Sequence, residues 1–235
     1  MPMKFFKHLI WLLLLPVTGP SLADAEVLPF QTFTAHYRGE ANGLEVEELG
    51  YRSLEALEDQ RYRLRYEASA MIYKLEETSV FSWDGQPRPH AYDSSRGTFL
   101  NKRQSRLRFD WASGLGRYRH KDKKGEFELQ PGLQDPLTSL LLLAAEIQSG
   151  KREVSMLEAK GDDREVRRFV LLDQPEIDTK LGKLKTYHVQ RLHDDEDRHT
   201  ELWLHHEYPF ILVRVEQDDE GDRFLLELTG FELTQ

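Results

Sequence analysis

The stretch from Arg88 to Lys124 is strongly basic. It contains eleven lysines and arginines against three acids, a local charge of +8. The planar guanidinium group of arginine binds phosphate and carboxylate groups through two parallel hydrogen bonds. The stretch therefore predicts contact with an anion, such as a lipid headgroup or the acidic surface of another protein, although a solvated strand face would show the same residues. The predicted anion contacts are Lys102, Arg103, Arg106 and Arg108.

Histidines and acids gather in the C-terminal third of the chain. Five histidines lie between His188 and His206, and the acidic run Asp194–Asp197 lies among them. Imidazole and carboxylate groups together bind zinc, copper or calcium. No HExxH motif or other ligand spacing is present, and the segment from His193 to His199 is typical of a hairpin tip. We predict an exposed acidic turn there, with no metal site and no cofactor.

Signatures of catalysis are missing from the sequence. There is no nucleophile elbow, Walker loop or metallopeptidase helix, and the chain has no cysteine. Glu76 and Glu77 are adjacent, but neighbouring residues of a strand point to opposite faces and do not form an acid–base pair by themselves. We predict that the protein is not an enzyme. A site assembled by the fold from distant carboxylates stays open as an alternative.

Large aromatic residues recur on the apolar phases of several predicted strands. If the sheet and the helix leave a gap, these side chains line an apolar cavity for an acyl chain or a similar ligand. If they leave none, the same side chains form an ordinary core, and the sequence leaves both cases open. The predicted ligand-binding residues are Tyr66, Phe81, Trp83, Phe109, Trp111, Leu141 and Trp203.

Alternating apolar and polar residues predict the strands that position these side chains. The clearest run is Arg61 to Ala70, where Tyr62, Leu64 and Tyr66 share one face and arginines share the other. Turn-forming groups such as Asp84–Pro87 separate successive runs at spacings that suit hairpins. The intervening helices that parallel strands need are missing, so we expect an antiparallel sheet.

One segment predicts a helix. Asp135 suits the N-cap, Pro136 suits the first turn, apolar residues follow at helical spacing to Ile147, and Gly150 suits the end. The residues expected to be buried against the sheet are Leu140, Leu141 and Ala144. The predicted fold is mainly β: a single curved antiparallel sheet of about ten strands, an open or half barrel wrapped around one main helix.

The N-terminus predicts export. Lys4 and Lys7 precede the apolar run Leu9–Leu15, and two overlapping small-x-small cleavage sites follow at residues 21–23 and 23–25. We predict a cleaved signal peptide over residues 1–25 and a single β-rich periplasmic domain over residues 26–235. The apolar run is shorter than the ~20 residues of a spanning helix, so no membrane-spanning segment is expected. The net charge of −9 argues against a nucleic-acid partner.

Three stretches resemble the exported bacterial family catalogued as domain of unknown function 3108. They are Phe81–Pro89, Gln134–Leu141, and Leu202–Leu204 with Tyr208–Val215. The third is also similar to the strand–turn–strand of periplasmic lipoprotein carriers and related sigma-factor regulators. The resemblance implies an open, strongly curved antiparallel sheet wrapped around a helix. Members of the carrier families hold lipid chains in the apolar concavity, whereas the unknown-function family has no agreed activity or catalytic residues.

Three functions are consistent with the sequence. The first is a non-enzymatic periplasmic protein that binds an apolar or lipidated ligand, a lipid or a lipoprotein, in the concavity of the curved sheet. The second is an envelope protein with a packed core, which interacts with or regulates another protein through its charged surface. The third is an enzyme without a recognisable signature. Buried carboxylates with shifted pKa values in a cleft favour the third.

Overall fold

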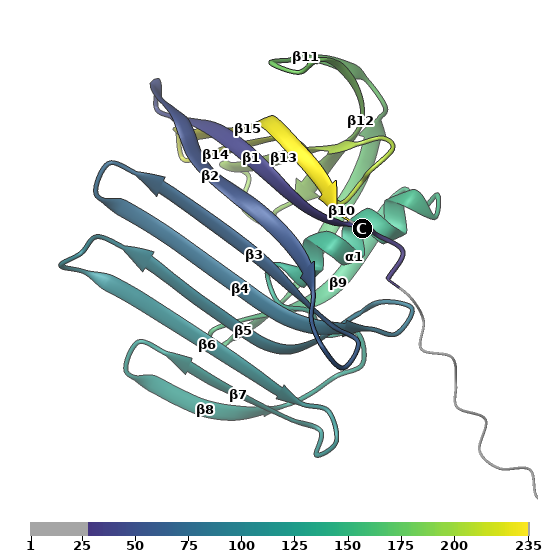
Figure 1. The fold of residues 1–235 in the computed structure, drawn as a ribbon. Helices are drawn as coiled ribbons and strands as arrows, with labels where there is room; N and C mark the ends of the chain where they lie inside the picture. Colours follow the sequence, from purple (N-terminus) through teal and green to yellow (C-terminus); the bar gives the residue numbers. More distant parts are fainter. Residues whose placement is uncertain (1–27, 235) are drawn as a thin grey trace, which may run out of the picture.

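The computed structural model describes residues 28–234, so the predicted signal peptide lies outside the described residues. Fifteen strands and one helix, α1 (Thr138–Gln148), make up the described part (Figure 1). The strands are β1 (Thr32–Ala41), β2 (Leu44–Ala56), β3 (Arg61–Ala70), β4 (Tyr73–Trp83), β5 (Pro87–Gly97), β6 (Lys102–Asp110), β7 (Leu115–His120), β8 (Lys123–Glu128), β9 (Glu153–Lys160), β10 (Asp163–Asp173), β11 (Glu176–Thr179), β12 (Gly182–Leu192), β13 (Arg198–His205), β14 (Leu212–Asp219) and β15 (Asp222–Thr234).

All the paired strands belong to one antiparallel sheet. The order runs from β8 down to β1, passes to β15, and continues through β14, β13, β12 and β10 to β9, while β11 pairs with β12 at the side. The sheet curls around α1 without closing into a barrel (Figure 1). This confirms the predicted fold class. The prediction of about ten strands was too low, because short polar strands such as β7 and β8 lack clear alternation.

The strand phases follow the predicted alternation. β3 has the predicted bounds, with Leu64 fully buried on its inner face. One exception is Glu227 on β15, which is buried although it is acidic. It is held there by hydrogen bonds of 2.9 Å from Arg38 and 3.0 Å from Arg214.

The helix begins slightly later than predicted. α1 starts at Thr138, because Pro136 and Leu137 form a turn, but Asp135 still caps it. One oxygen of its carboxyl, Oδ1, accepts hydrogen bonds from the backbone N–H groups of Leu137 at 2.9 Å and Thr138 at 3.0 Å. Gly150, with φ +95°, ends the helix by donating to the carbonyl of Ile147.

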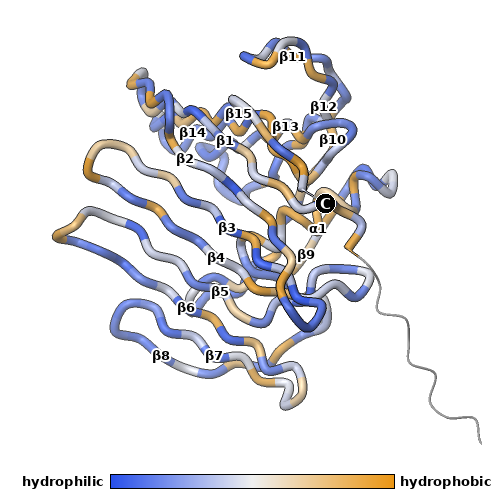
Figure 2. Tube along the Cα trace, in the orientation of Figure 1, coloured by the Kyte–Doolittle hydropathy of each residue, from blue (hydrophilic) through white to orange (hydrophobic). Residues whose placement is uncertain are grey.

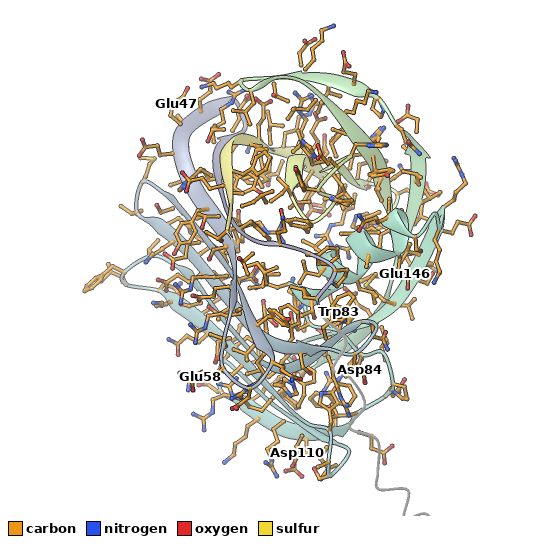
Figure 3. All side chains as sticks on the ribbon, turned by 45° about the vertical axis from the view of Figure 1, so that its right-hand side comes forward. Glu47, Glu58, Trp83, Asp84, Asp110 and Glu146 are labelled. Atoms are coloured by element: carbon orange, nitrogen blue, oxygen red, sulfur yellow. The ribbon has the colours of Figure 1, made fainter. Side chains whose placement is uncertain are left out.

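The core lies between the curved sheet and the helix. α1 packs against β5 and β9, and side chains fill the space around it (Figure 3). Leu141 and Ala144 are buried as predicted, whereas Leu140 is only half-buried, because it lies on the side of α1 that the sheet does not fully cover. Among residues 28–234, no helix combines the length and the apolar character that crossing a membrane requires.

The turns of the first eight strands lie at two opposite edges. The β4–β5 turn, marked by Asp84, and the end of β6, marked by Asp110, lie at the lower end of the molecule in Figure 3. The turns at residues 71–72, 98–101 and 121–122 lie at the other edge, on the left in Figure 1. We call this second edge the distal edge, because α1 lies on the other side of the molecule.

Candidate functional site

A basic cleft lies at the distal edge. It has a volume of about 630 Å³ and is formed by the start of β6, the end of β7 and the turns beside them. The charged side chains that line it are five cations and one carboxylate. The residues that define this basic cleft are Asn101, Lys102, Arg103, Gln104, Arg106, Arg119, Lys121 and Asp122.

Three of the four predicted anion contacts belong to the basic cleft. Lys102, Arg103 and Arg106 line it, but Arg108 does not. The Arg108 guanidinium instead bonds both carboxylate oxygens of Asp93, each at 3.0 Å. Sequence analysis did not single out Arg119 and Lys121, because their place in the cleft depends on the pairing of β7 with β6.

The register of the sheet places like charges directly opposite one another. Arg106 on β6 faces Arg119 on β7, which in turn faces Lys124 on β8. Arg96 on β5 faces Arg103 on β6 in the same way. Directly opposed like charges destabilise a sheet. The distal edge therefore stores electrostatic repulsion, in the Arg106–Arg119 pair on one face of β6 and in the Arg96–Arg103 pair on the other.

Few of these cations are neutralised by the protein itself. Lys102 lies 3.5 Å from a carboxylate oxygen of Glu76, and Arg106 lies 3.5 Å from one of Asp93. Within residues 28–234, no carboxylate oxygen comes within 4.0 Å of the side-chain nitrogens of Arg103, Arg119 or Lys121. The cleft is thus positive and largely uncompensated.

A second cleft adjoins the basic cleft. Its volume is about 470 Å³, and Arg103 and Asn101 line both clefts. Tyr73 and Arg96 also line it, so an aromatic ring and two arginines share one hollow. This arrangement suits a ligand with a charged group and an apolar part.

The predicted ligand-binding residues do not form one site. Phe81, Phe109 and Leu141 are buried in the core, and Trp203 is buried in the other half of the sheet, where its ring stacks on His188 at 4.3 Å. Tyr66 is half-buried on the inner face of β3.

The two remaining tryptophans lie near the end opposite the distal edge. Trp83, labelled in Figure 3, packs edge-on against Phe30 at 5.6 Å between ring centres. Trp111 follows the end of β6 and stacks on Phe109, and its indole N–H donates to the carbonyl of Pro89 at 2.6 Å. Trp111 lines a cleft of about 330 Å³ with mixed polar and apolar walls.

A buried polar cluster was missed by sequence analysis. The Ser79 hydroxyl donates to the Asp135 carboxyl at 2.5 Å, and the Tyr92 hydroxyl donates to Glu77 at 2.6 Å. Burial raises the pKa of Asp135 to about 7, and it also raises the pKa of Glu77. Alternation in β4 places Glu77 and Ser79 on the same inner face as Phe81, and this was the signal available in the sequence.

This cluster supports the fold rather than forming an open site. Ser79 and Asp135 are fully buried, and Asp135 uses its oxygens to cap α1 and accept from Ser79. Neighbouring Gln134 joins distant strands, since its backbone pairs with β9 and its side-chain amide donates to the carbonyl of Pro87 at 3.0 Å. The cluster anchors the helix N-terminus between β4, β5 and β9.

The side chains of the described residues do not form a metal site. Across residues 28–234, no group of three or more His, Cys, Asp or Glu side chains is arranged to hold a metal ion. His188 instead lies between two carboxylates, 3.1 Å from Asp173 and 3.0 Å from Glu201.

A solved structure shares the fold. A beta-barrel-like protein of domain of unknown function DUF1849 from Brucella abortus is similar with a TM-score of 0.62 and 11% identity, over 88% of this chain and 100% of that chain. At this identity the likeness concerns the fold alone. PNGF-II, with a TM-score of 0.28, and a DUF1089 family protein from Pseudomonas aeruginosa, with 0.30, are too dissimilar to inform it.

The sequence comparisons define the family. No match was found among the curated proteins. A family model matches residues 32–229, which include all three of the stretches that carry the resemblance. The chain therefore belongs to the family described as "Protein of unknown function (DUF3108)", as the resemblance predicted.

Proposed function

We propose that the protein is a non-enzymatic binding protein of the bacterial periplasm, which holds the anionic headgroup of a lipid or lipidated ligand in the basic cleft. One observation carries the proposal: five cationic residues line a cleft whose lining contains a single carboxylate. The periplasmic location comes from the predicted signal peptide. The absence of a catalytic motif supports a binding role.

The geometry of the basic cleft suits a phosphate-bearing group. Arg103, Arg106 and Arg119 present forked donors, which match phosphate and carboxylate oxygens. The volume of about 630 Å³ falls within the range of small-molecule sites, roughly 300–1,000 Å³. The opposed pair Arg106–Arg119 lies within the cleft and adds a driving force, because a bound anion relieves its repulsion.

The concavity of the sheet is a weaker candidate for the ligand. α1 occupies it, and the interior aromatic residues pack on one another and on the helix. Leu141 and Phe81, which were expected to face a ligand, have almost no exposed surface. We therefore place the charged group of the ligand at the distal edge and not inside the sheet.

Reversing two charges of the cleft is expected to abolish most of the binding. The doubly substituted variant Arg103→Glu, Lys121→Glu should bind dihexanoyl phosphatidylglycerol at least about tenfold more weakly than the parent, because each cation near an anionic headgroup contributes about 1 kcal/mol. Isothermal titration calorimetry below the micelle concentration measures the affinity. Raising the salt to about 0.5 M should weaken the binding of the parent.

The double variant Lys183→Glu, Lys185→Glu is the matched control, because both lysines are exposed on β12 away from the cleft. It changes the charge in the same direction and should leave the affinity unchanged. Arg103→Glu also removes the repulsion from Arg96, so a thermal melt should show no loss of stability. The proposal is wrong if the parent binds no anionic headgroup, or if the double substitution on β12 weakens binding as much as the cleft variant.

A further inference from the structure

Two hairpin tips of the distal edge expose large apolar side chains. At the β3–β4 turn, Met71 is 89% and Ile72 is 78% exposed. At the β5–β6 turn, Phe99 is 98% and Leu100 is 92% exposed. Figure 2 shows both tips in orange, whereas the tip of the β7–β8 hairpin beside them is blue. The apolar side chains are therefore gathered on neighbouring tips.

The β3–β4 tip is unfavourable for an isolated hairpin. Met71 adopts φ +53°, a left-handed conformation that glycine, asparagine and aspartate normally occupy in tight turns. The Met71 side chain buries little of its surface within the chain, and β-branched Ile72 follows it into solvent. Lys121 at the β7–β8 tip has the same φ of +53°, so it is the exposed apolar side chains of the β3–β4 tip, and not its backbone, that point to a contact made outside the chain.

Cations lie directly behind the apolar tips. The cleft between the two tips is lined by Tyr73, Arg96 and Arg103, and the basic cleft adjoins it. In the described part of the chain, no carboxylate oxygen lies within 4.0 Å of the side-chain nitrogens of Arg96 or Arg103. Apolar side chains thus project furthest, and uncompensated positive charge forms the layer beneath them.

We propose that the distal edge docks on the surface of an anionic lipid bilayer. Met71, Ile72, Phe99 and Leu100 enter the boundary between headgroups and acyl chains, while the arginines behind them contact lipid phosphates. This layering matches the two parts of a membrane surface, an apolar interior under an anionic headgroup layer. The inference deepens the proposed function and rests on it for the charged contacts, since the same cations serve both.

The charge complementarity favours a bilayer as the occupant. The apolar residues lie on two separate turns and not on one continuous patch, so each tip presents a small wedge. A protein interface of standard size needs a continuous, well-packed surface on each partner. Separate wedges with a basic layer behind them enter a fluid surface without requiring a matching shape.

Vesicle flotation tests the inference. The parent protein should float with vesicles of phosphatidylethanolamine and phosphatidylglycerol, but not with vesicles of phosphatidylcholine alone. Ile72→Asp and Phe99→Asp should each lower the partition coefficient roughly tenfold or more, because each removes a large apolar side chain from the lipid. Leu181→Asp is the matched control, since Leu181 is exposed at the β11–β12 turn away from the distal edge, and it should bind like the parent.

The outcomes separate the inference from the proposed function. Phe99→Asp should keep the calorimetric affinity of the parent for soluble dihexanoyl phosphatidylglycerol, which supports separate roles for the tips and the cleft. A parent that binds the soluble lipid but no vesicles overturns the docking inference and leaves the proposed function standing. Equal losses in Phe99→Asp and Leu181→Asp also overturn it, as does equal binding of the parent to both kinds of vesicle, because the basic layer would then contribute nothing.

Discussion

Leu141→Asp is expected to unfold the protein or to cost several kcal/mol of its free energy of unfolding. Leu141 is 1% exposed, on the side of α1 that faces the sheet. A carboxylate there would lie among the apolar side chains of the core, and breaking a core with an unpaired charge is among the most destabilising substitutions. Urea unfolding followed by circular dichroism measures the change.

Gln148→Asp provides the control for this experiment. Gln148 is the last residue of α1 and is exposed, so an acid there should change the stability by about 0.5 kcal/mol or less. A Leu141→Asp variant that unfolds at the same urea concentration as the parent would show that α1 does not hold the core together.

Asp135→Asn is expected to remove a large pH dependence of stability. The pKa of the buried Asp135 carboxyl is raised to about 7 from an ordinary value of 3.8, mainly by burial, while hydrogen bonds from Ser79 and from the backbone limit the rise. Because the folded-state pKa is the higher one, folding takes up a proton. This contribution is fully present below about pH 4 and is lost as the pH rises towards 7.

The size of the effect follows from the shift. Ionising this group in the folded state costs on the order of 4 kcal/mol at neutral pH and above. Asparagine keeps the acceptor for the N–H groups of Leu137 and Thr138 and cannot ionise. Urea unfolding at about pH 5 and about pH 8 should show that the parent loses more stability than Asp135→Asn over this interval.

Asp84→Asn is the control, because Asp84 lies at an exposed turn, and this variant should lose as much stability as the parent between the two pH values. Equal slopes in the parent and Asp135→Asn would contradict the buried, ionisable state of Asp135.

The sequence predicted much of the fold because local patterns determine it. The alternation of apolar and polar residues predicted both ends of β3 correctly, and the Asp135–Pro136 pair predicted the start of the helix to within one turn. Short polar strands escaped prediction, since β7 and β8 carry too few apolar residues to show a phase. The half-exposed state of Leu140 depends on how α1 lies against β5 and β9, which no local pattern encodes.

The candidate site was predictable only in part. The composition between Arg88 and Lys124 pointed to Lys102, Arg103 and Arg106, but the opposition of Arg106 to Arg119 depends on strand register. The pairing of β6 with β5 brings Asp93 within reach of Arg108, whose guanidinium bonds this carboxylate outside the cleft. The buried pair of Ser79 and Asp135 joins residues far apart in the chain, and only the folded structure brings them together.

A titration followed by nuclear magnetic resonance tests the central claim most directly. Dihexanoyl phosphatidylglycerol is added to protein labelled with ¹⁵N, and the amide shifts are mapped on the fold. We predict that the largest changes fall within the segments Asn101 to Arg106 and Arg119 to Asp122, which contain the residues that define the basic cleft. Changes centred on Phe81, Phe109 and Leu141 would instead place the ligand inside the sheet, and they would contradict the assignment of binding to the distal edge.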